Sequence, residues 1–84
     1  MSPEPVSMSN LSAGEQAVVL TFGGGRAVQN RLASLGFTPG VGVNMTQNYG
    51  FGPLIVTVRG TRVALGRGEA AQILVQRCVT PTAA

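Results

Sequence analysis

Few side chains in this 84-residue sequence are able to catalyse a reaction or to hold a metal ion. The chain contains no histidine, a single cysteine, Cys78, and three acids, Glu4, Glu15 and Glu69. A serine or cysteine nucleophile usually needs a neighbouring base, most often histidine, and the scattered acids suit neither acid–base catalysis nor a closed metal site. An ion held by Glu15 or Glu69 with water is a weaker alternative to solvated or helix-capping carboxylates. The sequence therefore predicts a non-enzymatic protein with no metal site and no cofactor.

A run of three glycines at residues 23–25 precedes a predicted helix and superficially resembles a phosphate-binding loop. The N-terminus of a helix does favour an anion. However, the lysine and hydroxyl residue of a phosphate loop do not follow, and the spacing of a dinucleotide fingerprint is not met. A flexible joint between a strand and a helix explains these glycines more simply, so nucleotide binding is not expected.

Aromatic and arginine side chains, which are over-represented at binding hot spots, are the remaining candidates. Tyr49 and Phe51 lie in a glycine-rich loop, and Arg59 and Arg62 flank a predicted hairpin turn. We predict that these four residues bind a partner. Two alternatives stay open: Phe51 as a lid that plugs one end of a barrel, and the arginines as solvated charges at the end of the hairpin.

Two adjacent strands joined by a tight turn form the centre of the predicted fold. Residues 54–58 carry leucine or valine at every second position, so one face of this strand is apolar. The apolar row continues in a second strand over residues 62–65. Because glycine adopts positive φ without a Cβ clash, Gly60 and Thr61 are predicted to form a two-residue hairpin turn.

Helical spacing follows the glycine run. Residues 26–35 place apolar side chains at positions i, i+4 and i+7, which predicts one helix with an apolar stripe. Gly36 is predicted to end the helix in the left-handed conformation, and Phe37 is predicted to fold back onto Leu32. A Pro-Gly turn comes next. The structural positions predicted from these patterns are Leu32, Leu35, Gly36, Pro39, Gly40 and Gly60. The predicted core comprises Leu32, Leu35, Phe37, Val43, Val56, Val58, Leu65 and Ile73.

Further strands are predicted over residues 16–22, 41–46 and 73–77, with a helical turn at residues 69–72. We therefore expect a mainly β fold. It is a small SH3-like barrel of about five strands, with an α-helix inserted after the first strand and a short helical turn before the last. One domain is expected over residues 11–78. Flexible tails are expected at residues 1–10 and 79–84.

The charge and hydropathy of the chain point to the cytoplasm. The formal net charge is +3, but the arginines are spread from Arg26 to Arg77 and form no basic arm. No apolar run approaches the roughly 20 residues that cross a bilayer, and the first residues lack the features of a signal peptide. One cysteine fits a reducing compartment. Only 11% of the residues are charged, which is a mild indication of an interaction surface.

Three segments, in the same order, resemble the FeoA family. Residues 31–40 (RLASLGFTPG) are similar to the family's Arg-Leu, Leu-Gly and Pro-Gly pattern. Residues 53–65 carry a loop proline followed by VTVRGTRVAL, and residues 69–75 (EAAQILV) resemble its closing segment. The resemblance spans about residues 11–77. Two positions depart from it: Gly52 replaces a frequent acid, and Gly66 stands where basic residues often begin.

The resemblance implies an SH3-like barrel and a cytosolic accessory role in bacterial ferrous iron uptake. Its implied partner is the cytosolic part of FeoB, the membrane transporter that carries a GTPase domain, which the protein would modulate as an adaptor. The membrane would be met only through the transporter. Binding of nucleic acid by the barrel and a homo-oligomeric module are the alternatives. Of these, nucleic acid is not expected and the oligomeric state stays open.

Overall fold

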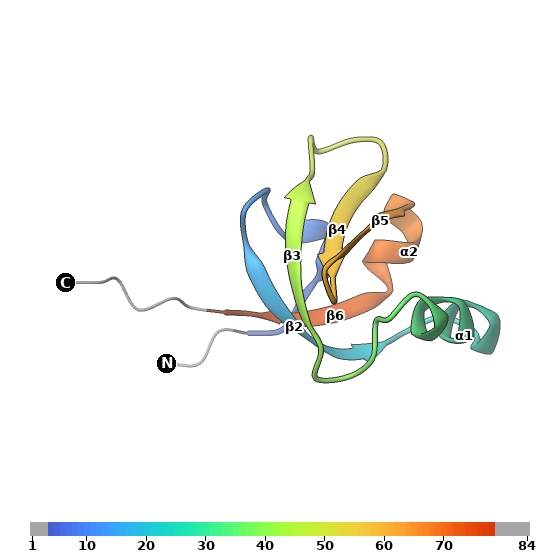
Figure 1. Ribbon diagram of the computed structural model, residues 1–84. Helices are drawn as coiled ribbons and strands as arrows, with labels where there is room; N and C mark the ends of the chain where they lie inside the picture. Colours follow the sequence, from blue (N-terminus) through green and yellow to red (C-terminus); the bar gives the residue numbers. More distant parts are fainter. Residues whose placement is uncertain (1–3, 79–84) are drawn as a thin grey trace.

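The structure, a computed structural model, describes residues 4–78 and contains one six-stranded antiparallel sheet. The strands are hydrogen-bonded in the order β1-β6-β2-β3-β4-β5. Figure 1 shows that the sheet is strongly curved, with α2 close to β5 and α1 projecting beyond the strands. The strands are β1 (Val6–Ser7), β2 (Gln16–Phe22), β3 (Gly42–Gln47), β4 (Leu54–Val58), β5 (Thr61–Leu65) and β6 (Ile73–Arg77). The helical segments are the 3₁₀ turn η1 (Met8–Asn10), α1 (Arg26–Ser34) and α2 (Arg67–Ala71).

The predicted mainly β fold is confirmed. The five predicted strands correspond to β2 to β6, α1 follows the first of them, and α2 precedes the last. Alternation along β4 is as expected, because Leu54, Val56 and Val58 are buried while Ile55 and Thr57 are partly exposed. The core comprises Met8, Leu11, Ala17, Val19, Leu32, Phe37, Val43, Met45, Leu54, Val56, Val58, Leu65, Ala70, Ile73 and Val75.

Helix α1 ends with the predicted left-handed glycine. Gly36 has a φ of +103°, a conformation that costs a residue with a Cβ atom about 1–2 kcal/mol. The amide of Phe37 donates to the carbonyl of Leu32 at 3.0 Å, and the amide of Gly36 donates to that of Ala33 at 3.0 Å. This pair of bonds is the Schellman motif, and its apolar contact is supplied by Leu32 and Phe37, which are both fully buried.

Leu35 is not part of the core, so that prediction is wrong. The side chain is 36% exposed, because α1 ends at Ser34 and Leu35 forms its C-cap. Helix α1 lies beside the sheet rather than across it, and Leu32 is the residue of the helix that is fully buried. The apolar stripe predicted from the periodicity is therefore longer than the part of the helix that packs against the sheet.

The hairpin between β4 and β5 turns one residue earlier than predicted. Val58 pairs with Thr61, so the two turn residues are Arg59 and Gly60. Both have positive φ, +52° and +79°, as a type I′ turn requires. The strained Arg59 lies over the helix cap, because a Cβ atom placed on Gly36 would lie 3.6 Å from its Cδ atom. Packing against the cap thus accompanies a backbone conformation that arginine rarely adopts.

The ordered structure also begins before Leu11, where the domain was expected to start. Val6 pairs with Val75 of β6, and Met8, the first residue of η1, is fully buried in the core. Because residues 1–10 are rich in serine and proline, their composition did not indicate that Val6 and Met8 belong to the folded domain. Residues 79–84, the expected C-terminal tail, lie outside the described residues.

Replacing Leu32 by alanine should lower the free energy of unfolding by about 2–5 kcal/mol, because the change leaves a cavity in the core. The matched change Leu35→Ala removes the same atoms from a partly exposed site and should cost less than about 1 kcal/mol. Urea unfolding of the two variants measures both values. Equal losses would contradict the placement of the helix.

Candidate functional site

The exposed aromatic residues lie in the loop of residues 48–53, which joins β3 to β4 and is called the aromatic loop below. Tyr49 is 69% exposed and Phe51 is 75% exposed. Large apolar side chains are usually buried, so two of them on one loop form an unusual surface feature. Phe51 does not plug the barrel, and the interpretation of this residue as a lid is wrong.

Asn48 fixes the base of the aromatic loop through both ends of its side-chain amide. Its Nδ2 donates to the carbonyl of Leu11 at 2.6 Å and to that of Ser9 at 3.2 Å. Its Oδ1 accepts from the backbone N–H of Gly50 at 2.9 Å and from Nη2 of Arg67 at 2.8 Å. The loop is therefore tied to η1 on one side and to α2 on the other, while its tip stays exposed.

Sequence reasoning did not single out Asn48 or Arg67. Arg67 is the first residue of α2, and its Nε atom is buried without a hydrogen-bond partner. Its charge is consequently held at the base of the loop rather than presented at the surface. Asn48 could have been identified from its position two residues before Gly50, since asparagine side chains often accept a hydrogen bond from the backbone N–H two residues ahead.

The two predicted arginines lie at the opposite end of β4. Arg59 is in the turn that follows β4, and Arg62 is exposed on β5, opposite Thr57. The five residues of β4 span roughly 17 Å between the aromatic loop, at the top of Figure 1, and this turn. Nη2 of Arg59 is 3.5 Å from Oγ1 of Thr38. The structure therefore does not bring the four predicted residues into one site.

Glu69 and Glu15 are both engaged in structural contacts. Oε1 of Glu69 accepts from the backbone N–H of Gly66 at 3.2 Å, which caps α2, and Oε2 forms an ion pair with Nε of Arg31 at 2.8 Å. Glu15 forms the matching pair with Arg77, also at 2.8 Å. Within residues 4–78, no group of three or more histidine, cysteine, aspartate or glutamate residues is placed to bind a metal ion.

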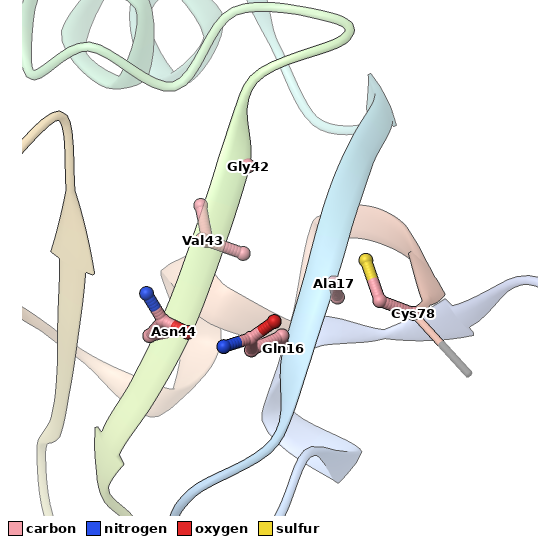
Figure 2. Close-up of a pocket in the computed structure, with 6 residues that line it drawn as sticks. All are labelled: Gln16, Ala17, Gly42, Val43, Asn44 and Cys78. Carbon is pink, nitrogen blue, oxygen red and sulfur yellow. The ribbon is translucent and has the colours of Figure 1, made fainter. Parts of the chain in front are cut away.

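A shallow pocket of about 250 Å³ opens between β2 and β3. Figure 2 shows the amides of Gln16 and Asn44 on one side of it and the sulfur of Cys78 on the other, beside Ala17. The backbone N–H of Cys78 donates to the carbonyl of Gln16 at 2.8 Å, which fixes the end of β6. Apart from the Cys78 thiol, the lining offers no acid or base that could activate a nucleophile, so this pocket does not form a catalytic constellation.

A family model described as the FeoA domain matches residues 6–77. The chain belongs to the FeoA family. It is 33% identical, over 75% of its own length and 76% of the relative's, to a candidate Fe(2+) transport protein A of Methanocaldococcus jannaschii. The start of the family match at residue 6 agrees with the start of β1.

Solved structures of FeoA proteins have the same fold. The crystal structure of an iron uptake regulatory protein (FeoA) aligns with a TM-score of 0.85 and 31% identity, covering 89% of this chain and all of the other. The zinc-complexed FeoA of Stenotrophomonas maltophilia, described as an SH3 domain protein, aligns with a TM-score of 0.73 and 35% identity, covering 82% and 87% of the two chains. The predicted SH3-like fold is confirmed.

Among the described residues of the FeoA chain, no helix is both long and apolar enough to span a membrane.

Replacing Asn48 by alanine should lower the free energy of unfolding by about 1–3 kcal/mol, because two backbone carbonyls, the N–H of Gly50 and the guanidinium of Arg67 lose a hydrogen-bond partner. Hydrogen exchange at Gly50 should accelerate at the same time, since its N–H donates to Asn48. The control Asn44→Ala, on the exposed face of β3, should change stability by less than about 0.5 kcal/mol. Slow exchange at Gly50 in the Asn48 variant would show that the loop is held in another way.

The stability of the protein should fall in acid partly through Glu15. The backbone N–H of Ser12 lowers the pKa of this carboxyl, desolvation partly opposes the effect, and the charge of Arg77 adds to it. A carboxyl whose pKa is lowered by folding stabilises the fold above its unfolded pKa and loses that contribution as the pH falls through the folded pKa. Glu15→Gln should therefore flatten the decline in stability below about pH 5.

Urea unfolding of the Glu15→Gln protein at several pH values measures this effect. Glu4→Gln is the control, since Glu4 is exposed near the start of the described chain. An acid decline that is equally steep in the wild type and in the Glu15 variant would show that other groups cause it.

Proposed function

We propose that this protein is a non-enzymatic accessory protein of ferrous iron transport, and that it docks onto the cytosolic part of the transporter FeoB. Membership of the FeoA family supports the role in ferrous iron transport, as do the names of its relatives, an Fe(2+) transport protein and an iron uptake regulatory protein. The single observation that carries the docking proposal is the exposed aromatic pair on a loop whose base is fixed.

The aromatic loop has the physical properties of a binding anchor. Phenylalanine and tyrosine bury roughly 150–250 Å² each when they enter a partner. Because Asn48 already holds the base of the loop, little conformational freedom is lost when Tyr49 and Phe51 bind, and less of the binding free energy is spent on ordering. A protein pocket lined with apolar side chains is the partner surface that these two rings fit.

The arrangement of charges favours a protein partner over nucleic acid. Binding of single-stranded nucleic acid uses exposed aromatic rings beside basic side chains that follow the phosphates. Here two of the exposed arginines, Arg59 and Arg62, lie at the far end of β4 from Tyr49 and Phe51. Arg67, at the base of the loop, is already engaged by Asn48.

Titration of the protein into the isolated cytosolic domain of the transporter, with and without guanine nucleotide, tests the proposal. The double change of Tyr49 and Phe51 to serine should weaken binding by at least about thirtyfold, because the loss of one hot-spot residue alone costs about 2 kcal/mol or more. The control is Leu74→Ser, because Leu74 is an exposed apolar residue on β6, away from the loop. Its affinity should stay within about twofold of the wild type.

Two results would contradict the proposal. If the double variant binds as tightly as the wild type while its thermal unfolding is unchanged, the aromatic loop is not the contact. If the wild type binds neither the isolated domain nor the complete transporter in detergent, FeoB is not the partner. Binding that depends on the nucleotide would support modulation of the GTPase domain.

A further inference from the structure

The sheet has two edges, and they differ in their ability to pair with another strand. β1 has two residues and follows Pro5, which cannot donate a backbone hydrogen bond. β5 has five residues, contains no proline, and pairs with β4 in a regular register without a bulge. Short strands, prolines and bulges are among the devices that prevent pairing at an edge, as are charged side chains. β5 lacks the first three, and Arg62 is the one charged side chain that it carries.

The register of the hairpin identifies the backbone groups that β5 leaves unpaired. In a two-residue hairpin the closing pair, here Val58 and Thr61, exchanges both of its hydrogen bonds. The N–H and C=O groups of residues 61, 63 and 65 therefore face β4, and those of Arg62 and Ala64 face outward. Among the described residues, no backbone hydrogen bond outside the β4–β5 ladder involves residues 61–65. These outward groups repeat at about 6.8 Å, the spacing of a β-ladder.

The side chains along this edge define the chemistry of its partner. Arg62 and Ala64 are exposed on the outer face, beside Thr57 and the partly buried Ile55 of β4. Arg59 adds a second exposed positive charge at the adjoining turn. An acidic side chain suits the position next to Arg62, and an apolar one suits the position two residues away, next to Ala64 and Ile55.

Glu15 and Glu69 are engaged in other ion pairs and do not neutralise this edge. Glu15 pairs with Arg77, and Glu69 pairs with Arg31. Pairing of β5 with a second copy of itself would place the arginines of the two copies close to one another, and like charges on adjacent strands are unfavourable. Charge complementarity therefore favours an acidic segment of another protein over self-association.

We infer that the free edge of β5 is a strand-addition site, which takes an extended segment of a partner protein with an acidic residue two positions from an apolar one. Main-chain hydrogen bonds at Arg62 and Ala64 supply affinity, and the side chain of Arg62 supplies selectivity. This contact is separate from the aromatic loop and does not depend on the identity of the transporter.

The test uses a capped synthetic peptide with the sequence Glu-Thr-Val-Thr-Glu, which places a glutamate next to Arg62 in either strand direction. The isotope-labelled protein is titrated with this peptide, and amide shifts and hydrogen exchange are followed by NMR. The amides of Arg62 and Ala64 should become protected by roughly tenfold or more. The same peptide with lysine in place of both glutamates should bind at least about tenfold more weakly.

Three variants separate the parts of the inference. Arg62→Glu should weaken peptide binding by roughly tenfold, whereas Arg26→Glu, the same charge change on exposed Arg26 of α1, should leave it within about twofold. Ala64→Pro removes an outward N–H that the isolated fold does not use, so it should abolish binding while the protein stays folded. The double Tyr49 and Phe51 variant should bind the peptide normally, which separates this result from the test of docking to the transporter.

Several outcomes would overturn the inference. These are no protection of Arg62 and Ala64 at millimolar peptide, shifts centred on the aromatic loop, or equal losses in the Arg62 and Arg26 variants. Tighter binding of a single-stranded oligonucleotide at the same amides would identify a nucleic-acid surface instead. Protection without peptide, together with a dimer in light scattering, would identify a second copy as the occupant.

Discussion

The hydrogen bonding of β4 between β3 and β5 is the constraint on which the rest of this structure depends. Its register directs Leu54, Val56 and Val58 into the core, and a shift by one residue would turn all three outward. The same register places the aromatic loop at one end of the strand and the turn with Arg59 at the other. It also decides which groups of β5 face away from the sheet. The core and the exposed candidate residues are therefore set by one strand pairing.

Helix α1 joins this arrangement through its C-terminal cap. Leu32 and Phe37 enter the core together, and the left-handed Gly36 lies between them, next to the side chain of Arg59. An added Cβ at Gly36 would meet Arg59 and Val58 only at ordinary contact distances, so its cost comes from the left-handed backbone. The ion pair between Arg31 and Glu69 then connects α1 to α2. Because both side chains of this pair are partly exposed, it contributes at most about 1 kcal/mol to stability.

The sequence allowed most of the fold to be predicted, because its signals are local. Alternation identified the strands, and the Leu32, Gly36 and Phe37 spacing identified the helix cap. The turn was misplaced by one residue because propensity disfavours arginine at positive φ, whereas Arg59 adopts a φ of +52° as the first turn residue. Burial of Met8 was missed for a similar reason: its partners are distant in sequence.

The residue types of the candidate site were easier to predict than their positions. Tyr49 and Phe51 were identified from their residue types, but the loop that carries them is joined to the fold by the bonds that Asn48 makes to Leu11 and Arg67. Periodicity carries no information about such contacts, because they join segments that are far apart in the chain. For the same reason, the sequence grouped two aromatic residues with two arginines that the fold separates.

This separation has a consequence for any partner that touches both surfaces. The aromatic loop and the turn lie roughly 17 Å apart, a distance at which substitutions usually act independently. A partner that used both would therefore need either a rigid face longer than β4 or two segments joined by a linker. In the second case, each contact can be weak, because the first one raises the effective concentration of the other. With both contacts made, a protein of this size would bind tightly, and it would dissociate by breaking one contact at a time. Loss of either contact alone would weaken its binding to the partner.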